Sequence, residues 1–428
     1  MASRSLPAPR HLRVVTGTER ASAISRWTTS PRRTLAILLG STTILTIVGV
    51  VMVLSASYVF SYVEYGSSFL FFKRQAVYAV VGFGALLLTS RMRYTVWQRL
   101  AAPFLGITIL LLVLVLHPSA GTVAGGSARW IALGPVTIQP SEFAKLALIA
   151  FGATVLSRRW KDLDDLRTLL LPLLPVTLVV CGLVMLQPDL GTTVILAGSM
   201  FMLVFATGIS IKRFIAGTAT AAGLGTILIL TETYRRERLL SFLHPWQDPA
   251  NKGYQLIQSL IALGSGGWFG VGLGASRQKW LYVPNAHTDF IFAVLGEELG
   301  LIGELVVIAL FCALLYSGIR IAAKAPDAFG RLLAGGIVSW LGLQVVVNLG
   351  AVTGLLPVTG VPLPLMSFGG SSLVVSLAAI GILVNIGRAE TAAEVRAGDA
   401  NRSQRSASSA RATPRGTKET PAKTGSRR

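Results

Sequence analysis

Ten long apolar runs, separated by short charged segments, constrain this chain more than any other feature. Each run is close to the roughly 20 residues that an α-helix needs to cross a bilayer. Charged residues make up only 14% of the 428, against about 25% in an ordinary soluble chain. The pattern predicts an all-α polytopic membrane protein with about ten transmembrane helices. The runs cover about 34–59, 75–90, 100–116, 139–156, 169–187, 190–208, 213–231, 289–317, 331–352 and 371–387.

Two basic tails flank this apolar region. Residues 34–387 form the predicted membrane domain, whereas 1–33 and 388–428 are poor in apolar residues and are expected to be disordered. Much of the net charge of +20 lies in these tails. No basic fold studded with aromatic residues is apparent, so we expect the tails to lie beside anionic membrane lipids and not to bind nucleic acid.

The short loops predict an orientation. Basic residues concentrate after every second run, which by the positive-inside rule places those loops and both tails in the cytoplasm. The segment 232–288, between the seventh and eighth runs, is then a large extracytoplasmic loop. The outward segments are rich in Gly, Pro, Trp and polar residues, and such backbone persists at membrane level only where protein buries it or water fills a cavity. We therefore expect the outer halves of the helices to surround a cavity.

The stretch YVPNAHTDFIFAVLGEELG carries carboxylates at the mouth of the eighth run and inside it. Asp289 lies at the boundary beside His287, where it could cap the helix, as Thr288 also could, or meet a substrate. Glu297 follows about 12 Å deeper along a helix. Together with Glu298 and Glu304 it could line a polar cavity or form hydrogen bonds between helices.

Three other segments on the outer side contain candidate residues. Arg235 and Arg238 share a helical face, where they could clamp a pyrophosphate or contact lipid headgroups. A helix is predicted in GYQLIQSLIALGSGG, and the six glycines of the following GSGGWFGVGLGAS indicate close backbone approach to another helix or to a ligand. Glu142 and Lys145 open the fourth run, where an ion pair is the ordinary expectation, as a helix cap is for Ser141.

Five long motifs, in order, resemble one family: QPSEFAKLALI, QPDLGTT, GYQLIQSLIALGSGGWFGVGLGASRQK, AHTDFIFAVLGEELG and GLLPVTGVPLPLMSFGGSS. They are similar to those of the SEDS (shape, elongation, division, sporulation) proteins, over roughly residues 34–387. The segment VMVLSASYVFSY is more similar to the FtsW branch than to the RodA branch. Asn285 and Thr359 stand where many members carry Glu and Lys, so no role of those positions is transferred.

The resemblance implies a ten-span peptidoglycan glycosyltransferase that polymerises lipid II, an undecaprenyl-pyrophosphate-linked disaccharide-pentapeptide. Asp289 matches the essential acidic position and would be the general base. A divalent cation such as Mg²⁺ or Mn²⁺ could replace the basic residues at the pyrophosphate, although no metal-ligand spacing is visible. The remaining predicted substrate-binding residues are Glu142, Lys145, Arg235, Arg238, Gln278, Lys279, His287 and Ser367.

The implied partners are the growing glycan strand, a class B penicillin-binding protein of the FtsI type and other divisome membrane proteins. The implied location is the bacterial cell membrane at the division septum, with an extracytoplasmic active site. Three alternatives remain: a lipid II flippase, a RodA-like elongation polymerase, and a non-catalytic scaffold for the transpeptidase.

Overall fold

The structure is a computed structural model and describes residues 30–118, 121–124, 127–134, 136–160, 170–213, 215–220, 223, 241–251, 253–277, 280 and 286–412. All structural statements below refer to these residues. Most of the seventh predicted run lies outside them, and so do residues 1–29 and 413–428.

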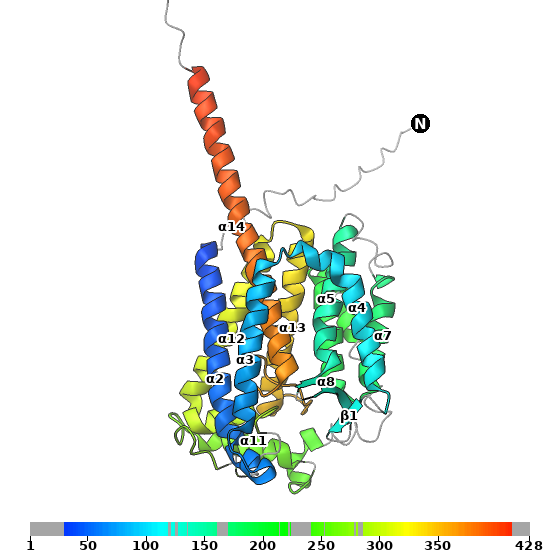
Figure 1. The fold of residues 1–428 in the computed structure, drawn as a ribbon, viewed down its shortest axis with the longest axis vertical. Helices are drawn as coiled ribbons and strands as arrows, with labels where there is room; N and C mark the ends of the chain where they lie inside the picture. The colour runs from blue at the N-terminus through cyan, green and yellow to red at the C-terminus, as the bar shows by residue number, and fades with distance from the viewer. Residues whose placement is uncertain are drawn as a thin grey trace, which may run out of the picture.

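The chain folds mainly into helices that run side by side (Figure 1). Ser30 caps the first of them, and Pro31 occupies its first turn, a position that suits proline. The longer helices are α2 (Pro31–Tyr65), α3 (Leu70–Arg91), α4 (Thr95–Val115), α5 (Pro140–Arg158), α12 (Ile291–Lys324), α13 (Ala328–Val352) and α14 (Gly370–Ala412). The shorter elements are α7 (Leu174–Met185), α8 (Leu190–Phe205), the 3-10 turn η1 (Pro245–Gln247) and α11 (Tyr254–Ser265).

Within the described residues, six helices are long and apolar enough to cross a membrane. They are α2, α3, α4, α12, α13 and the part of α14 from Gly370 to Thr391. Helices α7 and α8 are apolar but shorter. The total of ten spans stays a prediction, as does the loop between the seventh and eighth.

Two expectations need correction. The segment 117–140 contains a small antiparallel sheet of β1 (Gly121–Ala124), β2 (Ser127–Leu133) and β3 (Val136–Ile138), so the fold is not purely α-helical. Its strands contain Thr, Val, Ile and Trp, which favour extended backbone, with a left-handed glycine, Gly134, between β2 and β3. At the other end of the chain, α14 continues as a helix to Ala412, where a tail had been expected from residue 388. Alanine and glutamate in the first part of that segment favour a helix.

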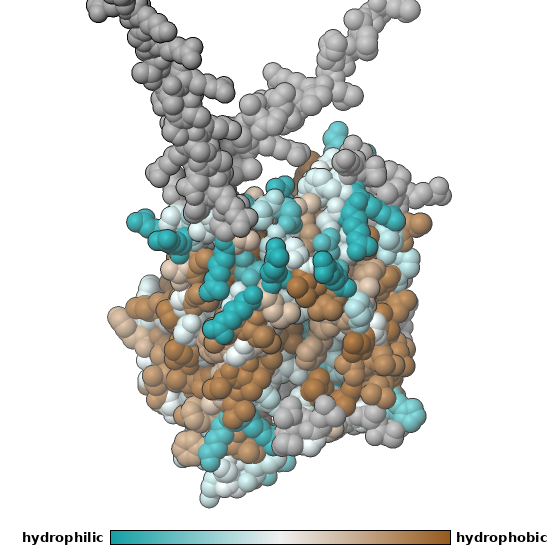
Figure 2. Space-filling view, turned by 45° about the horizontal axis from the view of Figure 1, so that its top comes forward, coloured by the Kyte–Doolittle hydropathy of each residue, from teal (hydrophilic) through white to brown (hydrophobic). Residues whose placement is uncertain are grey.

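The exposed side chains divide the surface into a belt and two ends. Figure 2 shows hydrophobic residues around the middle, with hydrophilic residues gathered towards the end from which α14 projects. Val80 and Leu110, 74% and 66% exposed, are typical of the belt. Because lipid tails are as apolar as leucine, such a belt needs no polar cover in a bilayer.

The end from which α14 projects is tied by polar contacts between three elements. The amide of Tyr94, before α4, donates to Asn385 Oδ1 of α14 at 2.8 Å. Asn385 Nδ2 donates to the carbonyl of Ser90 in α3 at 2.9 Å, and the Tyr94 hydroxyl donates to Asp327 at the start of α13. The opposite end holds the sheet, α11 and the loop 353–369 (Figure 1).

Candidate active site

Asp289 lies immediately before α12, at the end of the molecule opposite the α14 projection. Of the two roles left open for Asp289, the N-cap is not found: the cap residue of α12 is Phe290, with no side-chain hydrogen bond to the helix start. The Asp289 carbonyl accepts a hydrogen bond of 2.8 Å from Asn348 Nδ2 of α13. On the other side lies Gly360 in the left-handed conformation, where a Cβ would be 3.6 Å from Asp289 Oδ2. The partly exposed carboxylate therefore borders the loop 353–369.

His287 is packed among aromatic rings beside this carboxylate. Its ring stacks on Phe60 with a centroid distance of 5.4 Å and also contacts Phe71 and Phe368, at 4.9 and 5.8 Å. Burial lowers the pKa of His287 from 6.5 to about 4. The imidazole is thus neutral near pH 7 and brings no positive charge to a pyrophosphate.

Ser367 is brought close to His287, since the amide of the next residue, Phe368, donates to the His287 carbonyl at 2.9 Å. The Ser367 hydroxyl accepts from the Leu363 amide at 2.8 Å, and its carbonyl accepts from Gln75 Nε2 at 3.1 Å. Only 5% of Ser367 is exposed. These contacts hold the loop, and substrate binding by Ser367 stays a prediction.

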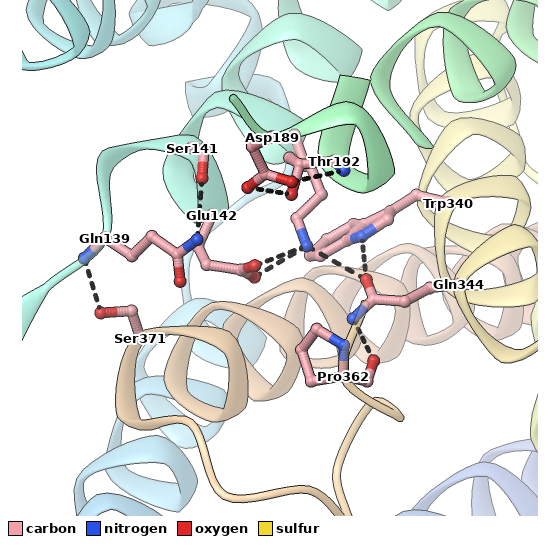
Figure 3. Close-up of polar contacts among 10 residues, drawn as sticks. Gln139, Ser141, Glu142, Asp189, Thr192, Trp340, Gln344, Pro362 and Ser371 are labelled. Carbon is pink, nitrogen blue, oxygen red and sulfur yellow. Dashed lines mark hydrogen bonds and ion pairs between the residues drawn. The ribbon is translucent and has the colours of Figure 1, made fainter. Parts of the chain in front are cut away.

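Glu142 and Lys145 form the expected ion pair at the start of α5, with Lys145 Nζ 2.9 and 2.8 Å from the two carboxylate oxygens (Figure 3). Each is 2% exposed. Lys145 Nζ also donates to Gln344 Oε1 at 3.1 Å and lies 5.1 Å from the Trp340 ring centroid. Such a buried pair is retained only with additional polar partners, which α13 supplies. The expected Ser141 cap is not found, because the cap position is Gln139.

Two amides of α13 were missed in the sequence and connect the ion pair to Asp289. Gln344 Nε2 donates to the Pro362 carbonyl at 2.9 Å, and Asn348 Nδ2 donates to the Val361 carbonyl at 2.8 Å, besides its bond to Asp289. A signal was available: Gln344 and Asn348 are four residues apart in an otherwise apolar helix, so they share one face.

Asp189 and Arg129 also lie at this end of the molecule. Asp189 caps α8, accepting from the amide and hydroxyl of Thr192 at 3.0 and 2.9 Å. Arg129 of β2 approaches Asp189 at 3.8 Å and donates to the Gln187 carbonyl at 3.1 Å. The α8 start in turn contacts the loop 353–369, because a Cβ on Gly191 would lie 2.6 Å from the Thr359 carbonyl.

The glycine-rich segment approaches a break in α12. Gly300 has φ 67° and ψ −172°, which interrupts the helical hydrogen bonds. The amides of Leu301 and Ile302 donate instead to the carbonyls of Gly267 and Trp268, at 2.9 and 3.3 Å. The predicted close approach of the glycine-rich segment to a helix is thus confirmed, and the helix is α12.

The freed α12 carbonyls are satisfied by the same segment. Those of Glu297 and Glu298 accept from the amides of Val271 and Gly272, at 2.9 and 3.1 Å. A broken helix survives in a membrane only when its backbone is satisfied in this way.

The three glutamates inside the eighth predicted run, Glu297, Glu298 and Glu304, make different contacts. Glu297 accepts from the Arg277 amide at 2.9 Å and from the Ser276 hydroxyl, which fixes the end of the glycine-rich segment. Glu298 accepts from Ser55 of α2 at 2.5 Å, a hydrogen bond between helices. Glu304 lies beyond the break, with Oε1 against Gly296.

Four predicted site residues, Arg235, Arg238, Gln278 and Lys279, lie outside the described residues, as does Asn285. Among the residues that the structure does describe, no three His, Cys, Asp or Glu side chains gather to hold a metal ion. The divalent cation considered above stays a prediction, and no reaction step is derived through one.

The sequence profile of the FtsW/RodA/SpoVE family, described as a cell cycle protein, matches residues 35–392. The chain belongs to this family. Stage V sporulation protein E of Bacillus subtilis is 45% identical over 361 residues, covering 84% of this chain and 98% of its own. The probable peptidoglycan glycosyltransferase FtsW of Geobacter metallireducens is 43% identical, with 80% and 91% covered. The Mycobacterium bovis protein of the same name is 40% identical, with 87% and 71% covered.

Solved members of the FtsW/RodA/SpoVE family share the fold. A chain from a peptidoglycan synthase complex that coordinates polymerisation and crosslinking superposes with a TM-score of 0.68, at 33% identity, covering 82% of this chain and 97% of its own. The rod shape determining protein RodA of Thermus thermophilus gives 0.60 at 30% identity, with 82% and 95% covered. The SEDS resemblance is thereby confirmed. Together with the six apolar helices, family membership shows an integral membrane protein.

Proposed function

We propose that this chain is a peptidoglycan glycosyltransferase that polymerises lipid II into β-1,4 glycan strands, at the septum, with a class B penicillin-binding protein as partner. One observation carries the proposal: the Asp289 carboxylate borders the loop 353–369, at the end of the molecule opposite the one where α3, α5 and α12 end on Arg91, Arg158 and Lys324. The positive-inside rule makes that end extracytoplasmic. The relatives named as probable peptidoglycan glycosyltransferases support the reaction class.

In the proposed reaction, Asp289 acts as the general base. Its carboxylate takes the proton from the 4-hydroxyl of the acceptor N-acetylglucosamine as that oxygen bonds to the anomeric carbon of the donor. The bond from the anomeric carbon to the phosphate oxygen breaks, and undecaprenyl pyrophosphate leaves with the electron pair. Attack opposite the leaving group inverts the α-linked phosphate to a β-1,4 bond.

In this proposal the remaining site residues shape the site or bind the substrate, and they take no part in the proton transfer. The neutral His287 closes the aromatic wall beside Asp289, and Lys145 offers positive charge from within the buried polar cluster of α5 and α13. Arg235, Arg238, Gln278 and Lys279 stay predicted contacts of the pyrophosphate, where forked or paired cations stabilise the charge of the leaving group.

A lipid II flippase is the second candidate, because the buried acidic residues Glu142, Glu297 and Glu298 lie in or beside apolar helices, as in transport pathways. A purified complex with the partner transpeptidase, supplied with lipid II, separates the two functions. We expect Asp289→Ala and Asp289→Asn to abolish glycan synthesis while the protein stays folded. Glycan strands made by Asp289→Ala would contradict the base assignment, and loss of lipid II translocation alone would favour the flippase.

A further inference from the structure

Asn348 is buried where α13 passes the start of α12, with 2% of the residue exposed. Its Nδ2 group donates two hydrogen bonds of 2.8 Å, one to the carbonyl of Asp289 and one to that of Val361. A single side chain therefore fixes both the turn that carries the proposed base and the loop that faces it. Among the described residues, Asn348 Oδ1 accepts no hydrogen bond, although it is buried.

The two halves of this amide differ. Oδ1 is buried without a described partner, which destabilises the fold, whereas Nδ2 satisfies two backbone carbonyls that an apolar residue would leave without a donor. The polar side chain is thus explained by what its donor holds, the carbonyls of Asp289 and Val361.

The loop side of the contact is equally constrained. Gly360 adopts φ 72° beside Asp289 Oδ2, and Gln344, one turn before Asn348, holds the adjacent carbonyl of Pro362 at 2.9 Å. Two amides on one helical face thus bind two successive carbonyls of the loop. Only Asn348 also reaches the Asp289 turn.

We propose that Asn348 is a positioning residue for Asp289: it holds the carbonyl of Asp289 and that of Val361 on one amide group, and thereby sets the carboxylate against the loop in the orientation that proton abstraction needs. The inference rests on the proposed function. A displaced base of this kind lowers turnover with little effect on substrate binding, because the acceptor and donor sites are left in place.

The test uses the full chain in complex with its partner. Asn348→Leu removes the donor at similar volume, and Asn348→Asp removes it while keeping the polarity. The matched control is Ser259→Ala, which deletes another buried bond to α13, of 2.8 Å to the Val352 carbonyl, one helical turn after Asn348. With lipid II as substrate, we expect both Asn348 variants to lower kcat by about 10- to 100-fold with KM unchanged. The control should keep wild-type kcat.

A second readout does not depend on catalysis. Asp289→Cys is prepared with Cys181→Ala and Cys312→Ala, which removes both native thiols. We expect Asn348→Leu to raise the rate at which a membrane-impermeant maleimide labels the thiol of Asp289→Cys, and Ser259→Ala to leave that rate unchanged.

The two readouts separate the outcomes. Faster labelling together with a fall in kcat supports the proposal. Faster labelling with unchanged kcat overturns it, and so does a fall in kcat that accompanies a lower unfolding midpoint without faster labelling. If Asp289→Ala itself still makes glycan, the proposed function fails, whereas the labelling result still reports whether Asn348 holds the turn.

Discussion

At the scale of single residues, most side chains near Asp289 act by holding geometry. His287 is neutral because aromatic rings bury it, and the Ser367 hydroxyl accepts a hydrogen bond from a backbone amide. Lys145 donates to both Glu142 and Gln344. Carboxylates and amines this deeply buried are tolerated only when every charge has a partner. Variants of Glu142 and Lys145 are therefore expected to separate the contribution of the ion pair to stability from its contribution to substrate binding.

Lys145→Leu should lower the free energy of unfolding by about 3–5 kcal/mol, because it leaves the Glu142 carboxylate buried without its cation. The double variant Glu142→Gln/Lys145→Leu should recover most of that loss. If Lys145 also binds substrate, as proposed, the double variant stays inactive. Thermal unfolding in detergent and lipid II polymerisation measure the two effects, and a double variant with restored activity would leave the pair a purely structural role.

At the scale of elements, the decisive feature is the break of α12 at Gly300. The glycine-rich segment replaces the interrupted helical hydrogen bonds with four of its own, and its backbone approaches so closely that side chains do not fit. A Cβ on Gly270 would lie 2.2 Å from the Glu298 carbonyl oxygen. The motif is thus a packing device between α11 and α12.

Gly270→Ala is predicted to destabilise the protein more than Gly274→Ala, by about 1–3 kcal/mol. Both glycines have φ 78°, so alanine at either position would lie in the left-handed region. Only a Cβ on Gly270 would clash, since no described atom lies within 4 Å of a Cβ built on Gly274. Unfolding midpoints of the two variants measure the difference, and equal midpoints would show that the close approach contributes nothing.

At the scale of the whole molecule, an apolar belt separates two different ends. One end is tied by Tyr94, Asn385 and Asp327, and carries many hydrophilic residues and the α14 extension. The other holds the sheet, the α8 cap and the Asp289 turn. This polarity lets the end that carries the proposed base be tested for its side of the membrane without an activity assay.

In a background without native thiols, Leu355→Cys should react with an impermeant maleimide added to spheroplasts, whereas Arg93→Cys should react only after permeabilisation. Leu355 is 76% exposed at the Asp289 end, and Arg93 is exposed in the turn before α4. The positive-inside rule is the physical basis. Labelling with the opposite sidedness would place Asp289 in the cytoplasm and remove its access to extracytoplasmic substrate.

The sequence by itself determined the helical membrane class, the Glu142–Lys145 pair and the close approach of the glycine-rich segment. The length of an apolar run, an i, i+3 spacing and the lack of side chains on glycines are local properties, so they do not depend on what the chain packs against. It left a helix cap open as one of two roles for Asp289 and missed the sheet at 121–138, since both depend on which competing partner a backbone group finds. Only the tertiary structure decided that Asn348 and Gln344 hold the loop beside Asp289, because those contacts join residues from α5, α12 and α13 that helix packing alone brings together.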